Sequence, residues 1–188
     1  MKENKQHHVC PVENAGILVT IFRKLIHNPA KILKGLISEG ITMLDFGSGP
    51  GFFTVEAAQM VGDSGKVIAA DLQQGMLDIL QKRISGKKIE SCIKLHKCSE
   101  SGIGISEQVD FVLIFYVLHE VPSQEMFFTE IMQILKPGGK VLLVEPKFHI
   151  TKQEFEKSVE IAKAHGLKPV ESRKIFYSRS VLFSKLMP

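Results

Sequence analysis

From residue 41 onward, short apolar runs rich in β-branched residues alternate with longer segments whose apolar positions recur every three to four residues. The short runs predict strands and the longer segments predict amphipathic helices. The expected strands are Ile41–Phe46, Val67–Asp71, Cys92–His96, Val109–Phe115, Lys140–Glu145, Pro169–Phe176 and Ser180–Leu186. The expected helices are Phe52–Val61, Met76–Ile84, Gln124–Leu135 and Lys152–His165. This alternation predicts an α/β fold with a mostly parallel sheet and helices on both faces.

The C-terminal part of the chain carries clear cap and turn signals. Thr151 and Glu154 have the spacing of a capping box, which predicts a helix start, and Gly166 predicts where that helix ends. Only the residues around Tyr177–Arg179 separate the last two expected strands, too few for a crossover between parallel strands. We therefore expect an antiparallel hairpin at one edge of a seven-stranded sheet, with one strand reversed.

Residues 1–40 lie outside this alternation. An apolar stripe over Ala15–His27 predicts a first helix. Asn28–Pro29 supplies an N-cap residue and a proline suited to the first helical position, so a second helix is expected through Leu36. The chain is thus expected to consist of a helical segment followed by an α/β domain over 41–188.

Composition narrows the class of protein. The 188 residues, 44% hydrophobic and 23% charged, suit one domain with a sizeable core. Lys and Arg outnumber Asp and Glu by 24 to 20, but the excess is dispersed, whereas nucleic-acid binding needs a concentrated basic face. No apolar run is long enough to span a membrane, and no secretory leader is evident. Cys10, Cys92 and Cys98 lack metal-ligand spacing, so we expect a cytoplasmic protein with free thiols and no metal.

The most informative stretch is the glycine-rich turn after the first expected strand, which reads Leu44-Asp45-Phe46-Gly47-Ser48-Gly49-Pro50-Gly51. Glycines let a backbone turn tightly and approach a ligand at the carboxyl end of a strand, where open α/β sheets bind. Asp71 ends the next expected strand, 20 residues after Gly51, the distance at which a carboxylate reaches ribose hydroxyls. Together they predict a nucleoside-containing ligand. Taken singly, the turn also fits a tight corner without a ligand, and Asp71 fits a helix cap.

The glycine spacing separates two classes of such ligand. Dinucleotide-binding proteins use GxGxxG, whereas this chain has GxGxG followed by Phe52 and Phe53. These bulky side chains oppose the close helix–strand packing that surrounds a pyrophosphate. Asp45 adds a carboxylate that would repel a pyrophosphate and suit an ammonium group. An NAD-dependent oxidoreductase is therefore the less favoured alternative.

At these residues the chain resembles the class I methyltransferases that use S-adenosyl-L-methionine (SAM). Residues 44–51 resemble motif I, Asp71 the acidic residue of motif II, Asp110–Ile114 the fourth strand, and Leu135–Leu142 the next turn and fifth strand. The resemblance covers 41–188 and is greatest to the small-molecule branch related to ubiquinone and menaquinone methyltransferases. It implies a Rossmann-like sheet of order 3-2-1-4-5-7-6, SAM as cofactor and a small-molecule acceptor.

The resemblance also assigns roles to individual residues. The donor-binding residues that it implies are Asp45, Gly47, Ser48, Gly49, Gly51, Asp71, Leu72, Cys98, Ser99 and Phe115. Asp45 and the glycine loop would hold the methionine part of SAM, Asp71 the ribose and Leu72 the adenine. Family members often place an Asp after the third strand to bind the adenine amino group. Here Cys98 is a poor acceptor, so adenine recognition is expected to pass to Ser99, a backbone carbonyl or water.

Candidate catalytic residues follow the fourth strand. His119 is a candidate general base, with Glu120 orienting or charging it, because an imidazole titrates near neutral pH. The alternative is that His119 caps or packs against the next helix. Glu145, Lys147 and His149 follow the fifth strand and either face the acceptor or are ordinary loop residues.

Several interpretations stay open at this point. The N-terminal helices are candidates for a lid that excludes water from the donor, although an ordinary helix packed on the sheet edge fits the same stripe. A SAM-binding module without catalysis, an RNA or DNA base methyltransferase, and a thiol or metalloid methyltransferase are the other classes. Phe115–Leu118 lacks the Asn/Asp-Pro-Pro-aromatic motif of amino-methylating nucleic-acid enzymes. The sequence predicts neither the acceptor nor the oligomeric state.

Overall fold

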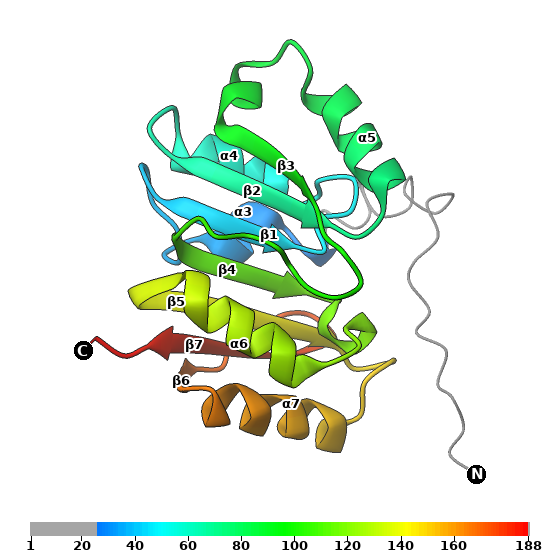
Figure 1. Cartoon of the computed structure of the whole chain (residues 1–188), viewed down its shortest axis with the longest axis vertical. Coiled ribbons are helices and arrows are strands. Elements are labelled where there is room, and N and C mark those ends of the chain that lie inside the picture. The colour runs from blue at the N-terminus through cyan, green and yellow to red at the C-terminus, as the bar shows by residue number, and fades with distance from the viewer. Residues whose placement is uncertain (1–25, 188) are drawn as a thin grey trace.

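Seven strands form one sheet in the computed structural model, which describes residues 26–187 (Figure 1). They are β1 (Thr42–Phe46), β2 (Lys66–Asp71), β3 (Ile93–Lys97), β4 (Val109–Phe115), β5 (Leu135–Pro146), β6 (Leu167–Glu171) and β7 (Ser178–Lys185). Their order across the sheet is β3-β2-β1-β4-β5-β7-β6. β7 pairs antiparallel with β5 and β6, and the other pairs are parallel. The predicted fold class, strand order and reversed strand are confirmed; β7 lies next to the edge, with β6 outside it.

Two strands, β5 and β6, differ from their predicted bounds by several residues, whereas the others differ by two residues or fewer at each end. β5 begins five residues before Lys140, because its first residue, Leu135, already pairs with Val109. The pairing register shifts between Val109 and Phe111, and this shift accommodates the glycine-containing turn of residues 136–139. β6 ends at Glu171, short of the predicted Phe176. The backbone hydrogen bonds between β6 and β7 end there, because the backbone N–H of Arg173 donates to the side-chain Oγ of Ser180 rather than to a strand carbonyl.

Five α-helices and two short 3-10 helices accompany the sheet within the described residues. They are α3 (Pro29–Leu33), α4 (Thr54–Val61), α5 (Gln74–Ile84), η2 (Lys88–Cys92), η3 (Leu118–Glu120), α6 (Gln124–Ile134) and α7 (Lys152–Ala164). Asn28 caps α3 as predicted, accepting from the backbone N–H of Lys31 at 3.1 Å. The expected extension of this helix through Leu36 is wrong, because Gly35 takes a left-handed φ of 74°. The predicted helix Ala15–His27 lies almost wholly outside the described residues, so its lid role stays a prediction.

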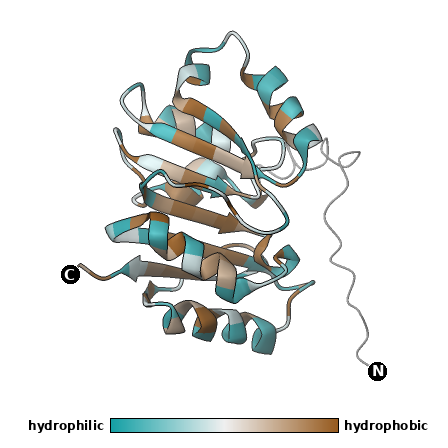
Figure 2. Ribbon diagram, viewed as in Figure 1, coloured by the Kyte–Doolittle hydropathy of each residue, from teal (hydrophilic) through white to brown (hydrophobic). Residues whose placement is uncertain are grey.

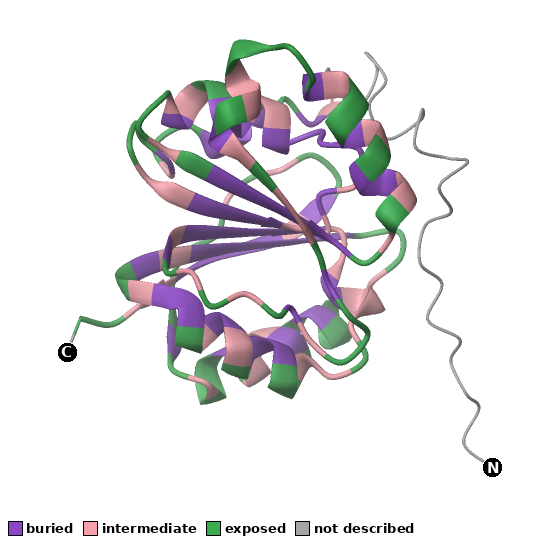
Figure 3. Cartoon of the chain, turned by 45° about the horizontal axis from the view of Figure 1, so that its top comes forward, coloured by how far each residue is buried: buried purple, intermediate pink, exposed green. Residues whose placement is uncertain are grey.

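Alternate side chains of the parallel strands point to opposite faces of the sheet and build two cores. Leu44 and Val112 pack with residues of α6 and α7, whereas Met43 and Phe111 pack with residues of α3 and α4. Figure 2 shows the strands as predominantly hydrophobic, and Figure 3 shows the central strands buried between helices whose outer faces are exposed. Burial of the strands on both faces explains why they read as continuous apolar runs.

The last helix confirms the predicted caps. Oγ1 of Thr151 accepts from the backbone N–H of Glu154 at 3.2 Å, and the Glu154 carboxylate accepts from the backbone N–H of Thr151 at 2.9 Å. Gly166 follows the helix with a φ of 94°. None of the helices in residues 26–187 is long and apolar enough to cross a membrane.

Candidate functional site

A cavity of about 880 Å³ lies where β1, β2, β4 and β5 end. β1, β2 and β4 run parallel, so their carboxyl ends meet at the same side of the sheet (Figure 1). Eleven of the twelve residues predicted for donor binding and catalysis line this cavity. They are Asp45, Gly47, Ser48, Gly49, Asp71, Leu72, Cys98, Ser99, Phe115, His119 and Glu120. The structure thus brings these residues together in one cavity, in the crevice where open α/β sheets bind ligands, and their binding and catalytic roles stay predictions.

The start of the glycine loop is folded over β2. The backbone N–H groups of Gly47 and Ser48 both donate to the carbonyl of Ala70, at 2.8 and 3.0 Å. Gly47 has a φ of 70°, and a Cβ there would lie 2.6 Å from Cγ2 of Val117, so no larger residue fits. Among the described residues, the buried Oγ of Ser48 has no hydrogen-bond partner. A buried hydroxyl without a partner on the cavity wall is suited to bind a polar ligand group.

Gly51 is the one predicted donor-binding residue that does not line the cavity. Its φ is 81°, and a Cβ at this position would lie 2.3 Å from Cδ1 of Leu80 in α5. Gly51 therefore permits close packing of the loop against a helix. The sequence could not distinguish this role from ligand contact, because it depends on where α5 packs.

Two buried carboxylates stand on either side of the loop. Oδ2 of Asp45 accepts from Oγ1 of Thr54 at 2.6 Å, and Asp45 is 2% exposed. Oδ2 of Asp71 accepts from the backbone N–H of Gly49 at 2.8 Å, while Oδ1 accepts from that of Gln73 at 2.9 Å. Burial raises the pKa of Asp71 above its ordinary value, and the backbone N–H donors only partly offset this. Each carboxylate is thus held in position beside the cavity.

Cys98 and Ser99 follow β3 at the side of the cavity near Asp71. The backbone N–H of Cys98 donates to the carbonyl of Asp71 at 2.9 Å. Burial, with the nearby charges of Asp71 and Glu130, raises the pKa of the Cys98 thiol to about 12, so the thiol is neutral. The Ser99 hydroxyl lies 2.9 Å from that of Ser101 and donates to the carbonyl of Gly102.

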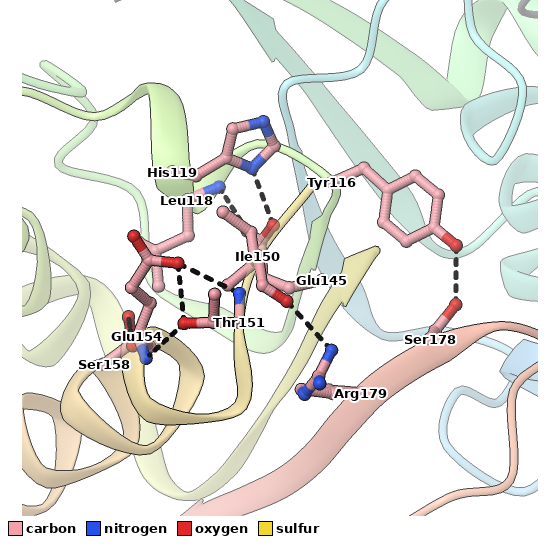
Figure 4. Close-up of polar contacts among 10 residues, drawn as sticks. All are labelled: Tyr116, Leu118, His119, Glu145, Ile150, Thr151, Glu154, Ser158, Ser178 and Arg179. Atoms are coloured by element: carbon pink, nitrogen blue, oxygen red, sulfur yellow. Dashed lines mark hydrogen bonds and ion pairs between the residues drawn. The ribbon is translucent and has the colours of Figure 1, made fainter. Parts of the chain in front are cut away.

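His119 is paired with a carboxylate that the sequence did not match to it. Nδ1 of His119 lies 2.6 Å from Oε2 of Glu145, whose Oε1 accepts from the backbone N–H of Leu118 at 2.9 Å (Figure 4). The predicted partner Glu120 also lines the cavity and contributes a charge, but Glu145 makes this hydrogen bond. Burial lowers the pKa of His119, yet the hydrogen bond and charge of Glu145, with the charge of Glu120, raise it above the ordinary value.

The other residues proposed after β5 separate into two groups. His149 lines the cavity, and its ring centroid lies 4.8 Å from that of His119. Lys147 lines a different cavity, formed with residues of α7 and β7. Of the two alternatives left open for these residues, facing the acceptor stays a prediction for His149, whereas Lys147 lies away from this cavity.

Tyr116 is a cavity residue that sequence reasoning did not propose. It has a left-handed φ of 62°, rare for a residue with a side chain. Its hydroxyl lies 2.5 Å from Oγ of Ser178 and 3.2 Å from Nε2 of His27, which also donates to the carbonyl of Phe176 at 3.0 Å. Three segments far apart in sequence meet here, so no local pattern indicated the contact.

Comparisons with known proteins agree with this geometry. The pattern of the family described as "Methyltransferase domain" matches residues 44–143. The chain is 36% identical over 110 residues to a demethylmenaquinone methyltransferase of Lactobacillus johnsonii, covering 58% of this chain and 45% of that protein. It is 27% identical over 121 residues to the ubiquinone/menaquinone biosynthesis C-methyltransferase UbiE of Shewanella frigidimarina, covering 62% and 48%. The chain thus spans about half the length of these relatives.

A solved structure matches over nearly the whole chain. It is a SAM-dependent methyltransferase from Aquifex aeolicus, with a TM-score of 0.83 and 25% identity, covering 95% of this chain and all of that one. The fold and the family both imply SAM as the cofactor. With the family pattern matching 100 of its 188 residues, the chain belongs to the methyltransferase domain family.

Proposed function

We propose that this protein transfers a methyl group from SAM to a small-molecule acceptor bound in the 880 Å³ cavity. The observation that carries the proposal is the placement of two buried carboxylates, Asp45 and Asp71, on either side of the glycine loop at the ends of β1 and β2. A cationic nucleoside matches this arrangement, because one acid suits an ammonium group and the other suits ribose hydroxyls.

The described residues fit the donor at several points. Asp45, Gly47, Ser48 and Gly49 would hold its methionine part, and the unpartnered Oγ of Ser48 offers a hydrogen bond there. Asp71 would hold the ribose. The adenine would lie along Leu72, Cys98, Ser99 and Phe115, which line one continuous cavity with the loop. Since both the hydroxyl and the backbone N–H of Ser99 donate to the carbonyl of Gly102 within this loop, the adenine amino group would be bound by a backbone carbonyl, which has a second lone pair, or through water.

Bound SAM supplies an electrophilic methyl group on a sulfonium. The chain contributes alignment, since a cavity that holds two reactants together lowers the barrier by on the order of 7–11 kcal/mol. His119 borders the same cavity and is the candidate to hold or accept a proton from the acceptor, with Glu120 on the same 3-10 helix contributing charge. The names of the relatives, which refer to quinone biosynthesis, support a small organic acceptor.

Isothermal titration calorimetry tests the proposal directly. The purified full chain is titrated with SAM, S-adenosylhomocysteine and NAD, together with the variant Asp71→Asn. The control is Asp63→Asn, which removes an exposed acid paired with Lys88 by the same chemical change. We expect SAM and S-adenosylhomocysteine to bind, NAD to fail, and Asp71→Asn to weaken SAM binding by about tenfold or more. Binding of NAD in place of SAM, or equal SAM affinity in both variants, would overturn the proposal.

A further inference from the structure

His119 on the wall of the cavity is in direct contact with a buried carboxylate, that of Glu145. Glu145, 2% exposed, uses one oxygen to accept from the backbone N–H of Leu118 and the other to contact Nδ1 of His119 at 2.6 Å. We propose that the methyl acceptor is an uncharged molecule that must lose a proton, that His119 takes this proton, and that Glu145 positions His119. This inference rests on the proposed function and names its acceptor class.

The contact with Glu145 determines which ring nitrogen of His119 is available. An ionised carboxylate only accepts hydrogen bonds, so Nδ1 must carry the hydrogen. In the neutral ring, Nε2 then holds the lone pair. Figure 4 shows Nε2 on the side of the ring away from Glu145, and His119 lines the cavity. The second hydrogen bond, from Leu118, fixes the carboxylate itself, so the ring is held by a group that cannot rotate freely.

The movement of charge during the reaction suits this pair. The lone pair of the acceptor atom forms the new bond to the methyl carbon, and the electron pair of the broken sulfur–carbon bond stays on sulfur as a thioether. The acceptor proton moves to Nε2. The positive charge that began on the sulfonium therefore ends on His119, 2.6 Å from the Glu145 carboxylate. An acceptor atom that is already deprotonated has no proton to lose and makes no use of the pair.

The charges of the cavity disfavour an anionic acceptor. Within residues 26–187, five carboxylates line it: Asp45, Asp71, Glu100, Glu120 and Glu130. Negative groups around a small cavity repel a phosphate or carboxylate on the incoming molecule, and repulsion between like charges is a strong determinant of specificity. An uncharged acceptor with a weakly acidic hydrogen meets no such penalty and supplies the proton that His119 is placed to receive.

In the part of the chain that the structure describes, three titratable groups face His119. Glu145 comes from β5, Glu120 from η3, and His149 from the segment after β5, with its ring centroid 4.8 Å away. A pH effect measured at this cavity therefore has to be assigned either to the His119 ring or to the His149 ring. NMR titration of the imidazole signals in the full chain, with His149→Gln to identify the second ring, provides that assignment.

The first experiment compares Glu145→Gln with Glu120→Gln, the same chemical change on either side of His119. In Glu145→Gln we expect the His119 pKa to fall, corresponding to about tenfold weaker proton binding or more, because burial remains while the carboxylate is lost. Glu120→Gln should lower the His119 pKa by less, and Glu160→Gln, on the exposed face of α7, should leave the His119 pKa unchanged. A His119 pKa that is unchanged in Glu145→Gln would overturn the positioning role. Circular dichroism excludes unfolding as the cause.

The second experiment tests the acceptor class with a matched pair of probes. 1,4-Naphthalenediol and 1,4-dihydroxy-2-naphthoate differ by one carboxylate, and each is titrated into the complex of the enzyme with S-adenosylhomocysteine. We expect the uncharged diol to bind about tenfold more tightly or better. Equal or tighter binding of the naphthoate, or no binding of the diol at millimolar concentration, would overturn the acceptor class. Failure of the proposed function is distinct, because S-adenosylhomocysteine itself would then not bind.

Discussion

Gly51 offers the sharpest test of how the glycine loop is built. Gly51→Ala introduces a Cβ at a φ of 81°, which costs roughly 1–2 kcal/mol for a residue with a side chain. The new Cβ also lies 2.3 Å from Cδ1 of the fully buried Leu80, so α5 or its side chains must move, and overpacking costs roughly a further 1–3 kcal/mol. We expect Gly51→Ala to lower the free energy of unfolding by about 2–5 kcal/mol.

The matched control is Gly86→Ala. Gly86 has a similar φ of 72°, but a Cβ there meets no atom within 4 Å, so only the backbone cost applies. Urea unfolding followed by circular dichroism gives both free energies, and their difference isolates the contact with Leu80. Gly51→Ala should be the less stable variant by about 1–3 kcal/mol.

Leu80→Ala extends the same test to a double variant. On its own it leaves a cavity and costs about 2–5 kcal/mol. In Gly51→Ala/Leu80→Ala, the space vacated by Leu80 accommodates the new Cβ, so the combined loss should be smaller than the sum of the single losses. Equal stability of Gly51→Ala and Gly86→Ala, or strict additivity in the double variant, would refute the assignment of Gly51 to helix packing.

Two further predictions concern titrating groups. Because the pKa of His119 is raised in the folded protein, its pairing with Glu145 stabilises the fold fully below the ordinary value of 6.5, and this contribution is lost as pH rises through the folded pKa. The difference in free energy of unfolding between wild type and Glu145→Gln, measured by urea unfolding, should therefore decrease from about pH 6 to about pH 8. An increase in this difference over the same range would contradict the pairing. Because the pKa of buried Cys98 is about 12, iodoacetamide at neutral pH should modify this thiol only after unfolding, and mass spectrometry showing rapid modification of the native protein would contradict this.

The fold was predictable wherever local sequence determines local structure. The predicted bounds of β4 agree with the structure, because seven residues buried almost throughout give an unmistakable apolar run. The cap at Thr151 and the N-cap at Asn28 also depend only on neighbouring residues. The predicted bounds are wrong where contacts with residues distant in sequence determine the end of a strand. β6 ends early because Ser180 of β7 competes for its backbone, and β5 begins early because Val109 of β4 pairs with its first residue.

The same distinction between local and distant contacts applies to the residues of the site. The glycine loop and Asp71 were predictable, since both follow strands that the pattern marks and their spacing is set by one β–α–β unit. The partner of His119 was not, because Glu145 is 26 residues away and reaches it through the register of β4 with β5, in which Phe115 pairs with Val144. A rule that pairs neighbours in sequence favours Glu120. The sheet instead places the end of β5 beside the segment that follows β4.

The three carboxylates buried among the described residues are Asp45, Asp71 and Glu145, and each stands at the carboxyl end of a parallel strand beside the cavity. Removing carboxylates from water destabilises a fold unless they are paired, and three in one region also repel each other. Their hydrogen bonds come from one hydroxyl, from backbone N–H groups and from one imidazole, and at Asp71 they offset only part of this cost, since burial still raises its pKa. A cationic ligand would offset more. We therefore expect a cationic ligand at this cavity to stabilise the protein, because a cation that binds only the folded state stabilises it by mass action.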